Sequence, residues 1–172
     1  WKFTTGHMKP MVDMAYGLQL YPAGNPPRLP LRSRNVDDLN VAFQSVSSDW
    51  AMSNMLDYKT YGGTTRALSS KPIDLSDETD YSDTVQIHEV DLSSALVDGS
   101  GLVLVEAWSR QIRNWKGAVQ VQRTLLQITD LGTTLKLGPD GLTAWVTRLS
   151  DGKPVENAAV SVYIGPSQVW TG

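Results

Sequence analysis

Two stretches near the C-terminus alternate between apolar and polar residues in the way that a half-buried β-strand requires. They are residues 142–149 (LTAWVTRL) and 158–164 (AAVSVYI). Successive side chains of a strand point to opposite faces of the sheet, so this alternation gives the strand one apolar face. Turn residues bound the first stretch, with Gly-Pro-Asp-Gly at 138–141 and Asp-Gly at 151–152. Glycine, proline and aspartate favour tight turns, and the pattern predicts two strands here.

The same alternation predicts further strands upstream. They cover residues 1–6, 11–21, 29–31, 40–46, 84–90, 101–109 and 118–129. In the second of these, Met14, Tyr16, Leu18 and Leu20 are expected on one face. The polar link at 110–117 makes the last two strands a hairpin. Many strands, turn residues between them and little helix predict an all-β fold, an antiparallel β-sandwich.

Three stretches depart from the strand pattern. Residues 49–56 predict a short helix with Ser48 or Asp49 as its cap. Residues 91–96 predict a single helical turn. Residues 57–83 have no periodicity and are rich in Gly, Ser, Thr and Asp, which predicts a long loop that is either packed over the surface or mobile. Trypsin is expected to cut this loop first, at Arg66 and Lys71.

Composition narrows the choice of protein class. The chain has 172 residues, enough for one or two domains of about 100–150 residues each. A net charge of −3 without a Lys/Arg run disfavours nucleic-acid binding, and the absence of cysteine excludes disulfides and thiolate metal sites. No apolar run approaches the roughly 18 residues of a membrane-spanning helix. Because the chain begins at Trp1, we expect a fragment of a longer protein whose targeting signal lies elsewhere.

Candidate metal and catalytic residues are few. Two histidines occur, His7 and His88, and His88 precedes Glu89 on a predicted strand, where neighbours point to opposite faces and cannot share one metal ion. An acidic run could hold calcium, but it has no EF-hand order, and a solvated loop is the better interpretation. This run comprises Asp74, Asp77, Glu78, Asp80 and Asp83. No GxSxG motif supports a serine hydrolase, and the turn at 99–101 is Gly-Ser-Gly.

Two other features have a structural interpretation. Residues 62–65, Gly-Gly-Thr-Thr, lack the lysine of a phosphate-binding loop and predict an ordinary loop. Four tryptophans, Trp108, Trp115, Trp145 and Trp170, lie on or beside predicted strands, where aromatic residues mostly fill a core or a domain junction. The sequence therefore predicts no catalytic, cofactor or metal site, and no enzyme.

The C-terminal part also carries a family resemblance. TDLG at 129–132, followed by PDGLTAWVTRLSDGKPVENAAVSVY at 139–163, resembles a macroglobulin-type β-sandwich domain of the bacterial α2-macroglobulins. Asn157 stands where that family often has glycine. The resemblance implies three parts: residues 1–8 as the end strand of a preceding domain or a linker, 9–129 as a macroglobulin-like sandwich with the long loop 57–83, and 130–172 as the truncated start of a next such domain.

The resemblance implies a non-catalytic scaffold fragment of a protease-trapping defence protein, an endopeptidase inhibitor. The parent would be a periplasmic lipoprotein anchored to the inner membrane. Its partners would be neighbouring macroglobulin domains and, through the whole protein, target proteases. Many members carry a thioester in a Cys-Gly-Glu-Gln motif; this chain has no cysteine, and hence no thioester. Unpaired strand faces in residues 130–172 predict self-association, with the row Val160, Val162 and Ile164 as an exposed template.

A second hypothesis from another class stays open. Exposed tryptophans on a sandwich could stack on sugars, as in an adhesin-like or carbohydrate-binding module. An enzyme is the third choice, and it would need a metal ion at the acidic run.

Overall fold

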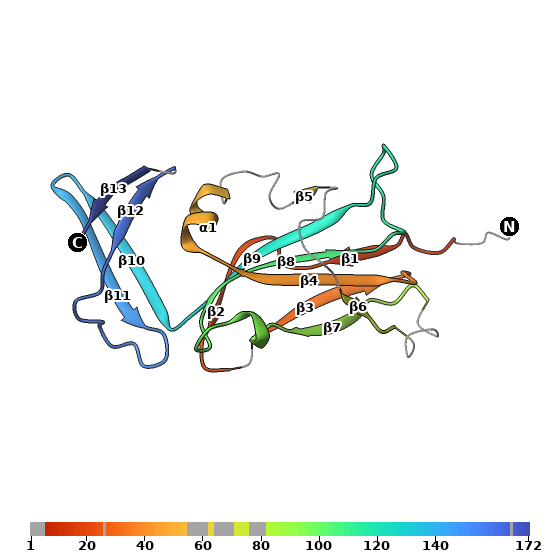
Figure 1. The fold of residues 1–172 in the computed structure, drawn as a ribbon, viewed down its shortest axis with the longest axis horizontal. Coiled ribbons are helices and arrows are strands. Elements are labelled where there is room, and N and C mark those ends of the chain that lie inside the picture. Colours follow the sequence, from red (N-terminus) through yellow and green to blue (C-terminus); the bar gives the residue numbers. More distant parts are fainter. Residues whose placement is uncertain (1–5, 26, 55–61, 64–70, 76–81, 166) are drawn as a thin grey trace, which may run out of the picture.

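The structure is a computed structural model that describes residues 6–25, 27–54, 62–63, 71–75, 82–165 and 167–172. Strands dominate these residues, as the all-β prediction requires (Figure 1). The elements are β1 (Met11–Asp13), β2 (Gly17–Pro22), β3 (Arg28–Arg34), β4 (Leu39–Val46), α1 (Ser48–Asn54), β5 (Gly62–Gly63), β6 (Lys71–Ile73), β7 (Gln86–Asp91), the 3₁₀ helix η2 (Ser93–Ala95), β8 (Gly101–Trp108), β9 (Val121–Thr129), β10 (Leu131–Gly138), β11 (Gly141–Arg148), β12 (Ser161–Ile164) and β13 (Ser167–Thr171).

Strands β1 to β9 form two sheets that face each other, which we call the first sandwich. One sheet has the order β1-β3-β7, and the other has the order β2-β9-β8-β4-β6 with β5 on the same edge of β9 as β2. All pairs are antiparallel except β2 with β9, which run parallel. The predicted hairpin is confirmed: β8 and β9 pair antiparallel from Gly101–Ile128 to Ala107–Gln122.

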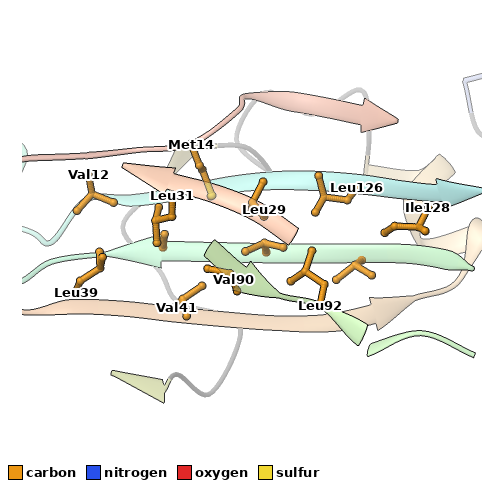
Figure 2. Packing of buried hydrophobic residues seen from close by; sticks show 13 residues of the cluster. Val12, Met14, Leu29, Leu31, Leu39, Val41, Val90, Leu92, Leu126 and Ile128 are labelled. Atoms are coloured by element: carbon orange, nitrogen blue, oxygen red, sulfur yellow. The ribbon is translucent and has the colours of Figure 1, made fainter. Parts of the chain in front are cut away.

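The core lies between the two sheets, and Figure 2 shows β3 and β7 laid across β4, β8 and β9. Alternate residues of these strands face this layer, so the apolar positions of the alternating sequence pattern are the buried ones. The buried cluster consists of Val12, Met14, Leu29, Leu31, Leu39, Val41, Val90, Leu92, Val103, Val105, Ala107, Leu126 and Ile128. Removal of this apolar area from water stabilises the sandwich at roughly 25 cal/mol per Å².

The predicted strand at 11–21 is wrong as one element, because it divides between the two sheets. β1 belongs to the small sheet and β2 to the large one, and Gly17, the first residue of β2, has φ 83°. This left-handed conformation is accessible to glycine without a Cβ penalty, and it lets the chain turn from one sheet to the other. The expected common face is also wrong: Met14 is in the core, whereas Tyr16, Leu18 and Leu20 are exposed.

Helix α1 covers part of the outer face of the large sheet. Its Ala51 packs with Leu125 of β9, and Trp50 and Leu102 lie against this pair. Ser47 Oγ accepts a hydrogen bond from Trp50 N at 3.1 Å, so the cap lies one residue earlier than predicted. Among the described residues, neither helix has the length and apolarity to span a bilayer.

The expectation that residues 57–83 form a loop without strands is wrong at two places. β5 pairs with Val121 and Gln122 of β9, and β6 pairs with the start of β4. Both strands are too short to show a period in the sequence. The other residues of this stretch lie outside the described ranges, except for Asp74, Leu75, Ser82 and Asp83. Of the two expected tryptic sites, Arg66 lies outside the described ranges and Lys71 is the first residue of β6. The predicted strand at 1–6 is likewise outside them apart from Gly6.

The chain beyond Thr129 folds into two antiparallel hairpins, β10–β11 and β12–β13, which we call the C-terminal hairpins. They lie beyond the end of the first sandwich in Figure 1, where they are blue. β11 and β12 were predicted, and β10 and β13 were not. Between the hairpins Asn157 has φ 54°, a left-handed conformation that asparagine tolerates better than most residues. A backbone requirement for positive φ explains why glycine suits this position in the family that the sequence resembles.

Candidate functional site

The two histidines lie in separate hydrogen-bonded groups. His88 Nε2 is 2.8 Å from Ser33 Oγ, across the β3–β7 pair at the edge of the core. His7 Nδ1 is 3.1 Å from Asp83 Oδ2 and 3.1 Å from Ser82 Oγ. No group of three or more metal-ligating side chains occurs within the described part of the chain. Both histidines therefore have structural partners.

Asp83, from the predicted acidic run, holds the entering chain against the small sheet. Its carboxylate accepts hydrogen bonds from Asn35 Nδ2 and from Met8 N, each at 2.6 Å, and Asn35 Oδ1 accepts one from Asp83 N at 2.8 Å. Asn35 and Asp83 both have positive φ, at 52° and 63°. Of the rest of the acidic run only Asp74 is described; Asp77, Glu78 and Asp80 lie outside the described residues. The contacts of Asp83 make it a structural clasp.

The hydrogen bonds of the Asp83 carboxylate predict that part of the stability of the fold is lost in acid. The hydrogen bond from Asn35, then that from Met8 and the His7 side chain, lower the pKa of Asp83. Its unfolded pKa is about 3.9, so the carboxylate stabilises the fold fully above about pH 5 and loses this effect as pH falls through the lower folded value. We expect Asp83→Ala to be less stable than the parent chain at neutral pH and to approach it in acid. Urea denaturation across this range measures the difference.

Asp140→Ala serves as the matched control for this experiment. Asp140 is an exposed aspartate in the turn between β10 and β11. A difference between Asp83→Ala and the parent chain that stays constant from neutral pH into acid would contradict the clasp.

The glycine-rich motifs have structural roles. Gly62 and Gly63 form β5 rather than the loop that the sequence predicts, and residues 64–65 lie outside the described ranges. Gly99 and Ser100 form the turn before β8, where Gly99 has φ 73° and Ser100 N donates to Val97 O at 3.1 Å.

The expected packing of tryptophans is right for one of the four. Trp108 is buried with Ala42 and Val121 on the outer face of the large sheet. Trp115, Trp145 and Trp170 are exposed in this chain, so none of the three fills its core. Among the described residues no layer packs over them, and period-2 alternation cannot show whether such a layer exists.

A buried ion pair lies on the outer face of the large sheet, and the sequence analysis missed it. Glu106 of β8 and Arg123 of β9 are directly opposite in the antiparallel register. The Arg123 Nε to Glu106 Oε1 distance is 2.6 Å, and the two side chains are 11% and 0% exposed. The available signal was a single glutamate in an otherwise apolar strand, GLVLVEAW. The burial of both charges shows that this face of the sheet is covered.

The junction between the first sandwich and the C-terminal hairpins is one residue long. β9 ends at Thr129, β10 begins at Leu131, and Asp130 between them binds the turn after β11. Asp130 O accepts from Leu149 N at 2.7 Å, and its carboxylate accepts from Ser150 N and Ser150 Oγ, both at 2.8 Å. So short and so fully bonded a link restricts how the hairpins can move relative to the sandwich.

Two further contacts support the junction. Ala23 N, just after β2, donates to Thr129 O at 3.0 Å. On the other side, a Cβ added to Gly132 would lie 2.8 Å from Leu149 Cδ2, so glycine lets Leu149 pack close to β10. Three positions of the TDLG motif at 129–132 therefore have a structural role. The carbonyl of Thr129 and the carboxylate of Asp130 accept hydrogen bonds, and Gly132 lets Leu149 pack close to β10.

The C-terminal hairpins expose an apolar surface that is large for their size. On one face, Leu135 lies opposite Ala144, and Leu137 lies opposite Leu142. Leu137 is 82% exposed. The exposed large apolar residues of the hairpins are Leu131, Leu135, Leu137, Leu142, Trp145, Leu149, Ile164, Val169 and Trp170. Leu131, Leu135, Leu137 and Leu142 share one face of β10–β11 in this register. Such grouped exposure marks an interaction surface, so the junction and this apolar face are the candidate functional site.

The row that the sequence predicted as an exposed template is only partly exposed. Ile164 is exposed, but Val160 and Val162 are half-buried. Val160 exchanges two backbone hydrogen bonds with Gly172, at 2.8 and 3.0 Å. The main exposed surface is therefore on β10–β11 rather than on β12.

Comparisons with known proteins identify the fold. No family model matches the chain, and no curated protein matches it. A crystal structure of native α2-macroglobulin from Escherichia coli spanning domains MG0-NIE-MG1 superposes with a TM-score of 0.68 at 18% identity, covering 99% of this chain and 56% of that one. A second, spanning NIE-MG1, gives 0.60 at 18% identity, covering 95% and 82%.

At this identity the likeness establishes the fold of macroglobulin domains. This chain spans about half the length of the first structure (56%), so it matches a part of that three-domain fragment.

Proposed function

We propose that this chain is a non-catalytic scaffold part of a bacterial α2-macroglobulin, a protein that traps proteases. The observation that carries the proposal is a likeness of fold over 99% of the chain to a fragment of the Escherichia coli protein. The motif at 129–163 supports it independently, because it comes from sequence rather than from shape.

In this proposal the scaffold acts by placing neighbouring domains. The sandwich ends near Thr129, and residues 130–172 belong to the next macroglobulin-like domain. The one-residue link with its Asp130 clamp gives a defined direction from one domain to the next. The exposed apolar face of β10–β11 then packs against neighbouring parts of the same protein. We place the whole protein in the periplasm, lipid-anchored to the inner membrane, in a defence role.

Protease assays test this function. We expect the full-length protein, treated with a protease, to block cleavage of a large protein substrate while cleavage of a small peptide substrate continues, which is the behaviour of a trap. The isolated chain is expected to leave both activities unchanged, because a scaffold has neither nucleophile nor bait. Stoichiometric inhibition by the isolated chain, or a full-length protein that never protects the large substrate, would contradict the proposal.

A carbohydrate-binding module is the second candidate, favoured by the exposed Trp115, Trp145 and Trp170. These side chains lie on separate elements: the β8–β9 turn, β11 and β13. Titration with a panel of oligosaccharides, followed by tryptophan fluorescence, decides between the two. Saturable quenching that is lost in Trp145→Ala would favour sugar binding over the scaffold.

A further inference from the structure

The turn between β8 and β9 presents one tryptophan to solvent on a well-ordered tip. Trp115 is 89% exposed. The turn lies at the end of the first sandwich away from the C-terminal hairpins, and it projects beyond the sheets in Figure 1. The indole combines an apolar ring system with a polar N–H, so it suits a contact in which one end is apolar and the other is wet.

Four hydrogen bonds within the tip pair part of its backbone polar groups. Asn114 N donates to Ala118 O at 2.9 Å, and Gly117 N donates to Asn114 O at 2.9 Å. Asn114 Oδ1 accepts from Lys116 N at 2.9 Å and from Ala118 N at 3.1 Å. Each of these bonds lowers the cost of moving the tip into a region poor in water, because a paired backbone group loses less there than an unpaired one.

The base of the tip is fixed as well. Asp38 Oδ1 accepts from Ser109 Oγ at 2.9 Å, and Asp38 Oδ2 accepts from Arg110 Nε at 3.0 Å. Asp37 N donates to Gln111 Oε1 at 2.6 Å. These bonds tie the β8 side of the turn to the residues just before β4, so the backbone that presents Trp115 has little conformational entropy left to lose on contact.

The charges at the tip are positive. Lys116 Nζ lies 4.7 Å from the centre of the Trp115 ring, and Arg113 Nη1 donates to Gly117 O at 2.8 Å. Residues 109–120 contain no aspartate or glutamate, although the whole chain has a net charge of −3. Arg110 forms an ion pair with Asp38. The cations of the tip that can attract an external anion are therefore Arg113 and Lys116.

We propose that this tip binds the surface of a membrane that contains anionic lipids, with the Trp115 indole in the interface and Arg113 and Lys116 at the headgroups. Indole rings prefer the boundary between water and acyl chains, and lysine and arginine beside them meet lipid phosphates. A protein pocket is less well matched, because the described tip is convex and offers a single large apolar residue surrounded by polar groups. A lipid surface accepts both kinds of group at once.

Vesicle sedimentation with the whole chain tests the inference. The vesicles are phosphatidylcholine alone, or phosphatidylcholine and phosphatidylglycerol in equal parts. We expect weak binding to the anionic vesicles, a loss of about tenfold in partition coefficient for Trp115→Ala, and a loss of about fivefold for each of Arg113→Gln and Lys116→Gln. On neutral vesicles, Arg113→Gln and Lys116→Gln should bind as well as the parent chain. On anionic vesicles, the loss of partition coefficient caused by each should become smaller as the salt concentration rises.

Ile87→Ala is the control, because it removes an exposed apolar side chain of β7, outside both the tip and the C-terminal hairpins. Trp115 is 89% exposed, so Trp115→Ala should keep the thermal midpoint of the parent chain. Three results would overturn the inference: no binding to either vesicle, which leaves the tip to a protein partner; equal binding by Trp115→Ala; or an equal loss for Ile87→Ala. Membrane contact here is independent of protease trapping, which the protease assays measure separately.

Discussion

Replacement of Glu106 by alanine is expected to lower the free energy of unfolding by about 3–5 kcal/mol. Glu106 is fully buried and Arg123 is 11% exposed, with 2.6 Å between Arg123 Nε and Glu106 Oε1. Removal of the carboxylate leaves a guanidinium with little access to water and without its main counter-charge, which costs more than the intact pair contributes. Urea denaturation of the parent chain and the variant measures the loss.

An exposed ion pair of similar geometry supplies the control. Arg28 Nη1 and Glu89 Oε2 are 2.7 Å apart, with side chains 57% and 59% exposed. Glu89→Ala should cost less than about 1 kcal/mol, because water and salt screen an exposed pair. If Glu106→Ala costs no more than Glu89→Ala, burial does not set the energy of this pair. The double variant Glu106→Leu, Arg123→Met should recover most of the loss, since apolar residues can replace a buried pair.

The second large effect concerns the state of association. We expect the whole chain to self-associate with rising concentration, and the variant Leu137→Lys, Leu142→Lys to remain monomeric. These two leucines are directly opposite on β10 and β11, at the turn end of the exposed apolar face. Burial of that face against a second copy removes apolar area from water. Analytical ultracentrifugation over a range of concentrations measures the association.

The control for self-association is Val97→Lys, which changes an exposed apolar residue of the first sandwich. It should leave the association constant unchanged. A chain that ends at Thr129 should also be monomeric. A whole chain that is strictly monomeric at high concentration, with slow amide exchange across residues 158–164, would show that the hairpins complete their own fold. The domain boundary proposed at residue 130 would then be wrong.

Local patterns in the sequence determined most of the strands. Alternation identified β8, β9 and β11, and turn residues placed the breaks between them. This works because side-chain direction in a strand depends only on the backbone of that strand. β10 was missed although Leu131, Leu135 and Leu137 share a face, because Gly132 and the pair of threonines between them hide the period.

Only the tertiary structure decided which faces are covered. Alternation gives each strand two faces but does not show whether another layer packs on either, so Glu106 is buried whereas Trp115 and Leu137 are exposed. The parallel pairing of β2 with β9 joins residues more than a hundred positions apart, and no local pattern specifies it. Of the candidate site, the sequence therefore predicted only the link at 129–132. The exposed apolar surface emerged from the packing, because exposure depends on contacts between distant segments.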